Sequence, residues 1–147
     1  MNRLELRWRT RPGGGHHTER RYLDYVVDGT SLHDRLRIGD QVTALGCWLP
    51  TSERRYIEQQ LLASPSGRVP LYVCAECGDL ACGAVTVQIE RTSEGFVWRD
   101  FAFENGYDED MRDAESYRGV GPFVFNRTEY WQVLHDRAVA LAEGDQV

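Results

Sequence analysis

Three of the four cysteines lie close together in the chain and have the spacing of metal ligands. Cys74 and Cys77 form a Cys-x-x-Cys pair that is followed by Gly78, and Cys82 comes shortly afterwards. Two thiolates at this spacing can meet one zinc ion, and the glycine permits the turn that directs backbone amides toward the sulfur atoms. The pattern therefore predicts a zinc knuckle, and zinc is the cofactor that we expect.

The sequence leaves the fourth metal ligand open. Cys47 lies in an apolar run that ends at Pro50, and it would complete a set of four thiolates. A histidine, Asp79 and a water molecule are the alternatives, because each supplies a lone pair that zinc accepts. His16 and His17 follow three glycines, and solvated turn residues are the simpler interpretation of that pair.

Two interpretations without metal remain open for the same cysteines. Free cysteine is among the most buried residue types, so Cys74 and Cys82 would pack inside a hairpin with Cys77 in its turn. A Cys-x-x-Cys pair is also a redox motif at a helix N-terminus, where the helix dipole lowers the pKa of the thiol. Here the pair precedes a strand, so that assistance is not expected. A metal- or thiol-dependent enzyme centred on the three cysteines is the alternative function.

The segment from Cys74 to Gly78 resembles one half of the knuckles of rubredoxin-like and zinc-ribbon domains. Those families use a second Cys-x-x-Cys pair that this sequence lacks, so the resemblance implies a zinc-binding turn without their full set of four cysteines. A longer box, from Tyr72 to Gly83 and again from Val97 to Phe101, resembles one in small uncharacterised actinobacterial proteins. That second resemblance implies no known activity.

A run of carboxylates between positions 100 and 115 is the second candidate site. Arg112 is the only basic residue before Glu115 in this run. Such a surface repels phosphate and attracts cations or a basic protein, although a solvated charged face without a partner is the plainer alternative. The side chains expected to contact a partner are Asp100, Glu104, Tyr107, Asp108, Glu109, Asp110 and Asp113. The function that we expect is a non-catalytic binding protein, of an immunity or adaptor type, that presents this acidic loop to a basic protein.

Composition and charge exclude several classes of protein. The 147 residues correspond to one domain over residues 1–147, and a net charge of −6 with a pI near 5.2 disfavours nucleic-acid binding. No stretch has the apolar length of a membrane span, and the start of the chain has no signal-peptide core. We therefore expect a cytoplasmic protein whose cysteines are thiols or metal ligands. The familiar enzyme motifs are missing, so no catalytic residue is predicted.

Alternating apolar residues predict an α+β fold with an antiparallel sheet of about five or six strands. Leu4, Leu6 and Trp8, for example, alternate with charged residues, which is typical of a strand with one buried face. The strands are expected at residues 3–10, 20–28, 69–75, 82–90 and 95–104, with a shorter one at 123–125. The two main helices, which we expect to cover one face of the sheet, lie near 52–63 and 127–143.

Local signals sharpen this outline. Thr30 or Ser31 can cap a short helix that follows it, and Asn126 can cap the last helix. The apolar run over residues 42–49 is consistent with either a buried strand or an irregular core segment. The alternation slips after Trp98, which predicts a bulge near Arg99. The charged residues expected to stay in solvent on the helix near 52–63 are Glu53, Arg54, Arg55 and Glu58.

Overall fold

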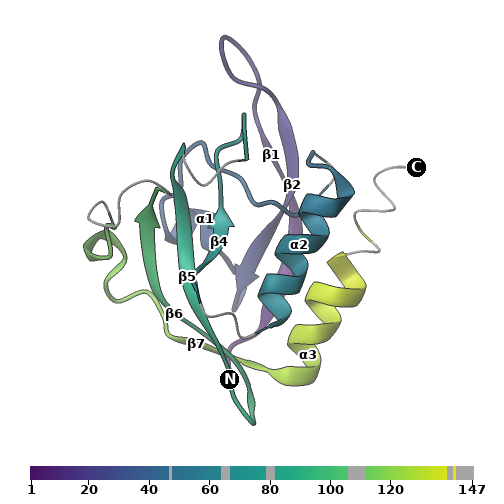
Figure 1. Cartoon of the computed structure of the whole chain (residues 1–147), viewed down its shortest axis with the longest axis vertical. Coiled ribbons are helices and arrows are strands. Elements are labelled where there is room, and N and C mark those ends of the chain that lie inside the picture. Colours follow the sequence, from purple (N-terminus) through teal and green to yellow (C-terminus); the bar gives the residue numbers. More distant parts are fainter. Residues whose placement is uncertain (47, 64–66, 79–81, 106–111, 139–140, 142–147) are drawn as a thin grey trace.

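Two antiparallel sheets lie beside a layer of helices in the computed structural model of this chain (Figure 1). The structure describes residues 1–46, 48–63, 67–78, 82–105, 112–138 and 141. The strand order is β1–β2–β3 in the first sheet and β4–β5–β6–β7 in the second. The predicted α+β class is confirmed. The single sheet of five or six strands is wrong, because hydrogen bonding divides the described strands between a three-stranded and a four-stranded sheet.

The first sheet is a long hairpin extended by a very short third strand. Its strands are β1 (Leu4–Arg11), β2 (Arg20–Val27) and β3 (Thr30–Ser31). Leu4 and Leu6 are buried while Arg7 is exposed, as the alternation of the sequence predicts. The connection between β1 and β2 projects beyond the rest of the molecule (Figure 1).

The second sheet is a meander in which each strand pairs with the next. Its strands are β4 (Val69–Tyr72), β5 (Ala84–Arg91), β6 (Gly95–Glu104) and β7 (Phe123–Asn126). The register of β5 against β6 shifts between Thr86 and Gln88, and on the β6 side Asp100 has a φ of 57°. This extra residue lets both Trp98 and Phe101 enter the core. The predicted bulge is therefore confirmed, one residue beyond its expected position.

Two of the helices have a side-chain cap at their N-terminus. The helices are α1 (Leu32–Arg35), α2 (Thr51–Leu62) and α3 (Arg127–Trp131), which continues as the π-helical segment η4 (Gln132–Arg137), and the 3-10 turn η3 (Glu115–Tyr117) precedes β7. Ser31 caps α1 by accepting from the N–H of Asp34. Asn126 caps α3 by accepting from the N–H groups of Thr128 and Glu129, so both predicted caps are confirmed. Among the described residues, no helix combines the length and apolar character needed to cross a bilayer.

The two main helices lie next to each other on one side of the molecule (Figure 1). Both helices begin where the sequence predicts. For the last helix, most of the predicted range beyond residue 138 lies outside the described part of the chain. The structure also has the short helix α1 in addition to these two. The charged face predicted for α2 is partly wrong. Arg54 and Glu58 are buried, with 3.5 Å between Nε and Oε1, because each offsets the charge of the other inside the core.

Short bridges connect the two sheets at both edges. Asn2 pairs with Phe125 at one edge, and at the other the segment 42–46 bridges Tyr22 of β2 and Val73, which directly follows β4. That segment is irregular chain with isolated bridges rather than a strand. The main cluster of buried apolar residues draws on both sheets and both main helices, and its largest members include Trp98, Tyr25, Tyr72, Tyr130 and Phe96. Because the sheets share this core, a group fixed on β4 is positioned relative to β1 and β2.

Candidate metal centre

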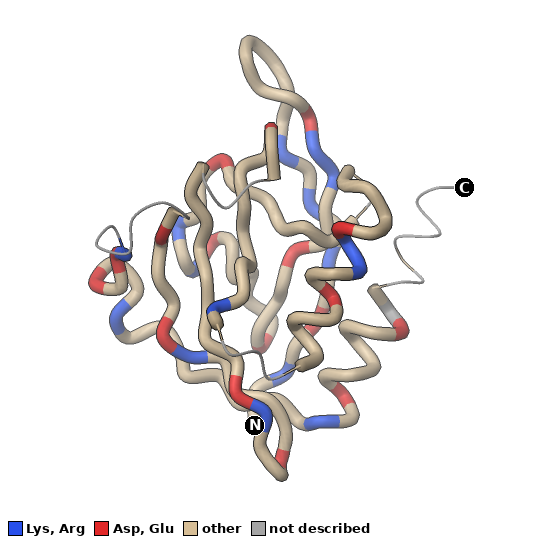
Figure 2. The backbone as a smooth tube through the Cα atoms, viewed as in Figure 1, with Lys and Arg blue, Asp and Glu red and all other residues tan. Residues whose placement is uncertain are grey.

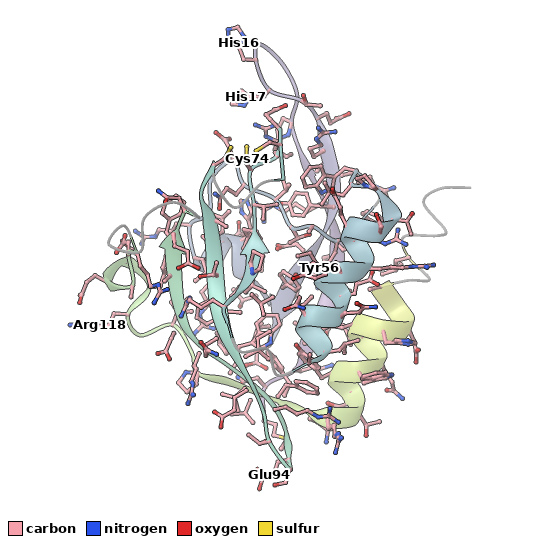
Figure 3. All side chains as sticks on the ribbon, viewed as in Figure 1. His16, His17, Tyr56, Cys74, Glu94 and Arg118 are labelled. Carbon is pink, nitrogen blue, oxygen red and sulfur yellow. The ribbon has the colours of Figure 1, made fainter. Side chains whose placement is uncertain are left out.

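The connection between β4 and β5 brings three sulfur atoms together at one end of the molecule (Figure 3). The Sγ atoms of Cys74, Cys77 and Cys82 all lie within 4.8 Å of one another, and 2.9 Å separates those of Cys77 and Cys82. Among the described residues, these are the ones that meet the geometry of a metal-ligand group. We call them the cysteine cluster.

The spacing of the cysteine cluster suits a zinc ion after a small expansion. Four thiolates at about 2.3 Å from zinc in a tetrahedron lie roughly 3.8 Å from each other. The distance of 2.9 Å between the sulfur atoms of Cys77 and Cys82 is shorter than this edge. Binding of a zinc ion would therefore increase the distance between these two sulfur atoms by about 1 Å. A turn can accommodate this increase without a change in the strands.

Backbone amides favour a thiolate at Cys74. The N–H of Cys77 donates to this sulfur and is the main reason for its lowered pKa; partial burial opposes the shift, and the N–H of Glu76 adds to it. The N–H of Gly78 also closes the turn by donating to the carbonyl of Cys74, at 2.9 Å. Such amide donors are what the Cys-x-x-Cys-Gly pattern predicts for a metal knuckle.

Cys82 holds its proton more firmly than an ordinary cysteine. Its hydrogen bond with Cys77 raises the pKa of the Cys82 thiol to about 11. The amide donors around Cys74 and the contact between Cys77 and Cys82 therefore shift the two pKa values in opposite directions, down at Cys74 and up at Cys82. A divalent cation would reverse the upward shift at Cys82, because its positive charge stabilises thiolates and releases the thiol proton.

Glu76, between the two knuckle cysteines, fastens the turn to the first sheet. Its Oε1 accepts from Nη1 of Arg11 at 2.8 Å and from the N–H of Thr18 at 2.9 Å, and its Oε2 accepts from the Thr18 hydroxyl at 2.7 Å. These donors, Arg11 first, lower the pKa of Glu76 to about 2. We call this arrangement the Glu76 clasp. Sequence analysis missed it, because a glutamate in a turn carries no sign of partners so distant in the chain.

Arg11 also determines whether His17 can act as a metal ligand. Figure 3 shows His16 at the far end of the β1–β2 connection and His17 closer to Cys74. Nη2 of Arg11 lies 2.6 Å from Nδ1 of His17. A guanidinium only donates, so Nδ1 accepts and the proton of the neutral ring resides on Nε2. In this arrangement neither ring nitrogen offers zinc a lone pair, which disfavours His17 among the predicted fourth ligands.

The knuckle also packs against an arginine and a tryptophan. Nε of Arg20 donates to the carbonyl of Ala75 at 2.8 Å, and its guanidinium lies 5.0 Å from the ring centre of Trp48. Gly78 has a φ of 67°, and a Cβ on it would approach the Leu49 side chain to 3.1 Å. A glycine is therefore required at this position by both backbone conformation and packing.

Of the four predicted cysteine ligands, Cys47 lies outside the described residues. It directly precedes Trp48, whose ring lies next to Gly78. Its role as a fourth ligand stays a prediction. The same is true of Asp79.

Deeper contacts hold both strands that carry the cluster. Tyr72, at the end of β4, donates its hydroxyl to the buried carboxylate of Asp24 in β2, at 2.6 Å. On the β5 side, the carbonyl of Gly83 accepts from Nε2 of Gln41 at 2.8 Å, and the ring of Phe103 lies against its Cα. The cluster is thus positioned by both sheets rather than by its own turn alone.

An open groove adjoins the cluster on the side of Cys77. Its volume is about 520 Å³. The residues that line it are Ala44, Leu49, Ser52, Glu53, Tyr56, Ile57, Pro70, Val73, Cys77 and Gly78. Most of these side chains are apolar, so small uncharged molecules can approach Cys77 from this side.

The acidic segment, residues 100–115, is only partly described, and Tyr107, Asp108, Glu109 and Asp110 lie outside the described residues. Glu104 accepts from Nε of Arg112 at 2.9 Å. The hydroxyl and the N–H of Ser116 donate to Asp113 and lower its pKa. Basic positions lie close to the acidic ones at this edge of the molecule (Figure 2). The described carboxylates are thus less available to a partner than the sequence suggested, and their binding role stays a prediction.

No protein-family model, curated protein sequence or solved structure matches this chain. The interpretation of the cysteine cluster therefore depends on its own geometry: converging sulfur atoms, amide donors and contacts to both sheets. The resemblance to zinc-ribbon knuckles remains a likeness over a few residues.

Proposed function

We propose that this chain is a non-catalytic binding protein in which one structural zinc ion is held by Cys74, Cys77 and Cys82. The convergence of the three Sγ atoms within 4.8 Å carries this proposal. Zinc prefers thiolate ligands in tetrahedral sites, and the amide donors around Cys74 favour the ionised form that binds metal. The fourth ligand is one of those left open by the sequence, with Cys47 as the first candidate.

Several contacts support a structural role for the metal. The knuckle is anchored by the Glu76 clasp and by Arg20, so its position is tied to the first sheet. Among the described residues, the main core does not include Cys74, Cys77 or Cys82. Zinc would thus order one end of the molecule and join the two sheets there, rather than being required for the whole fold.

Elemental analysis of the purified chain tests this proposal. We expect one zinc per chain, and a strongly reduced content in Cys74→Ser, Cys77→Ser and Cys82→Ser. Glu94→Gln is the control, because Glu94 lies at the opposite end of the molecule (Figure 3). Loss of zinc in Cys47→Ser would identify the fourth ligand. A chain that binds no zinc after reconstitution under reducing conditions would contradict the proposal.

We further propose that the acidic segment contacts a basic protein. The concentration of carboxylates between residues 100 and 115 supports this partner. The affinity should fall as salt is added, and it should fall further when Asp108, Glu109 and Asp110 are replaced by lysine. A partner that binds this charge-reversed protein as tightly as the original would contradict the proposal.

The alternative function is a metal- or thiol-dependent enzyme, which the groove beside Cys77 favours. A catalytic site would lose its activity in each cysteine variant while the thermal unfolding of the metal-free protein stayed unchanged. A structural site would lose order in the β4–β5 connection, visible as faster amide hydrogen exchange there.

A further inference from the structure

We infer that Cys77 and Cys82 form an oxidation site, where a peroxide converts the pair into a disulfide and thereby releases the metal. Disulfide formation follows from the geometry of the two thiols alone. Metal release rests, in addition, on the proposed zinc-binding function.

The two sulfur atoms are already close enough for this reaction. The distance of 2.9 Å between the two Sγ atoms exceeds the S–S bond length of a disulfide by only about 0.9 Å. Both residues are exposed, and they belong to one connection between two strands, so a small rotation of either side chain brings the atoms to bonding distance. The loop that the disulfide would close is short, which keeps the entropic cost of closure low.

Cys74 differs from the other two cysteines in its surroundings. Its side chain is half-buried, and its sulfur accepts from the amides of Glu76 and Cys77. Movement toward either partner would break these hydrogen bonds. Cys77, by contrast, lines the open groove through which a small oxidant can approach. The structure therefore selects the pair Cys77–Cys82 over the pairs that include Cys74.

The chemistry balances with hydrogen peroxide as the oxidant. The Cys77 thiolate attacks one peroxide oxygen, the O–O bond breaks, and hydroxide leaves, which gives a sulfenic acid at Cys77. The Cys82 sulfur then attacks the Cys77 sulfur, forming the S–S bond and expelling the hydroxyl group, which leaves as water with the Cys82 proton in the metal-free chain and with a proton from solvent in the zinc-loaded chain. In total the two thiols lose two electrons and two protons, and one peroxide becomes two water molecules.

The disulfide has a direct effect on metal binding. Zinc is held by thiolates, and oxidation removes two of the three that the cluster supplies. Cys74 with one further ligand would bind zinc much more weakly. The metal should therefore leave in proportion to the disulfide formed, and a reducing agent should restore binding.

Treatment of the zinc-loaded full chain with hydrogen peroxide tests the inference. Released zinc is followed with a chromophoric chelator, and the bond is located by peptide mass mapping without reduction. We expect one zinc released per Cys77–Cys82 disulfide, with recovery after dithiothreitol. A disulfide that includes Cys74 or Cys47, or oxidation to sulfonic acids without a disulfide, would overturn the assignment.

Two further measurements separate this inference from the zinc proposal. The metal-free chain is oxidised in parallel: a Cys77–Cys82 disulfide there supports the oxidation site even if the chain binds no zinc. Zinc binding without that disulfide, in either form of the chain, would leave the zinc proposal intact and contradict the oxidation site. In Cys82→Ser, dimedone should trap a sulfenic acid on Cys77, and trapping on Cys74 instead would contradict the order of steps.

Discussion

The cysteine cluster and the acidic segment are held in place in opposite ways. The knuckle is anchored by residues far away in the chain: Glu76 is 65 residues from Arg11 and 58 from Thr18, and Tyr72 is 48 from Asp24. The described carboxylates of the acidic segment pair locally, eight residues apart for Glu104–Arg112 and three for Asp113–Ser116. Changes at the cluster should therefore reach the first sheet, whereas changes in the acidic segment should stay local.

Among the predicted changes, removal of the metal from the cysteine cluster should have the largest effect on stability. A ligand that binds only the folded state adds about 2.7 kcal/mol when its free concentration is 100 times its Kd. For a chain of this size that corresponds to a Tm lower by roughly 5–10 °C after chelation. Calorimetry with and without chelator measures this shift. Cys77→Ser is the matched control, and the same shift in that variant would show that the chelator acts elsewhere.

Loss of the Glu76 clasp should weaken metal binding without removing a metal ligand. Glu76→Gln removes the negative charge that pairs with Arg11, so the knuckle is held less firmly against the first sheet. Outer contacts of this kind typically change metal affinity by about 10–100-fold. Competition with a chromophoric chelator gives the affinity, with Glu94→Gln as the control. An unchanged affinity would show that the clasp does not support the cluster.

Removal of the buried hydroxyl of Tyr72 should destabilise the fold directly. In Tyr72→Phe the carboxylate of Asp24 loses a donor at 2.6 Å inside the core, which should cost about 1–3 kcal/mol. Denaturant unfolding of the metal-free protein measures the loss. Tyr56→Phe is the matched control, because 60% of that side chain is exposed. Equal stability of the two variants would contradict the role assigned to the Tyr72–Asp24 contact.

A pH effect should come from His33, which packs against Tyr72 at a ring distance of 5.8 Å. Burial lowers the pKa of His33 from 6.5; Arg9 lowers it further, and Asp24 and Asp34 oppose the shift. The unfolded chain therefore takes up the proton first as the pH falls. The contribution of His33 to stability should be constant above about pH 6.5 and should fall from there toward the lower pKa that His33 has in the folded protein.

Denaturant midpoints of the reduced, metal-free chain on both sides of this window measure the effect. In His33→Gln the decline within the window should be smaller. A decline of the same size in that variant would assign the pH effect to other groups.

The smallest effect is expected in the acidic segment. Arg112→Ala removes the ion pair with Glu104; because 46% of the Arg112 side chain is exposed, solvent screens the pair, and its contribution should be about 1 kcal/mol or less. The zinc affinity of this variant should equal that of the unchanged chain. A marked loss of affinity would mean that the two regions are coupled, against the comparison drawn above.

The same contrast explains what could be predicted from the sequence. Alternation, caps and the bulge at Asp100 are local patterns, and each was found close to its expected place. The division into two sheets depends on which distant strands pair, which no local pattern specifies. The burial of Arg54 and Glu58 was missed because charged residues were assigned to solvent one at a time, whereas they enter the core as a pair.

At the candidate site, the sequence predicted the convergence of Cys74, Cys77 and Cys82, because their spacing and the following glycine are local; the role of Cys47 stays a prediction. It did not predict Glu76, Arg11 or Thr18, because the contacts of the clasp form only once the β1–β2 hairpin lies beside the knuckle. Cysteines with the spacing of metal ligands are thus easier to recognise in a sequence than the residues that hold them in position.

Titration of the reduced chain with cobalt(II), followed by absorption spectroscopy, tests the central claim most directly. Thiolate ligands give cobalt an intense charge-transfer band, and tetrahedral coordination gives strong visible bands. We predict both, saturating at one cobalt per chain, reversed by zinc, and greatly weakened in Cys74→Ser, Cys77→Ser and Cys82→Ser. A chain whose spectrum shows no thiolate charge transfer, or shows it equally in all three variants, would contradict a metal centre at the cysteine cluster.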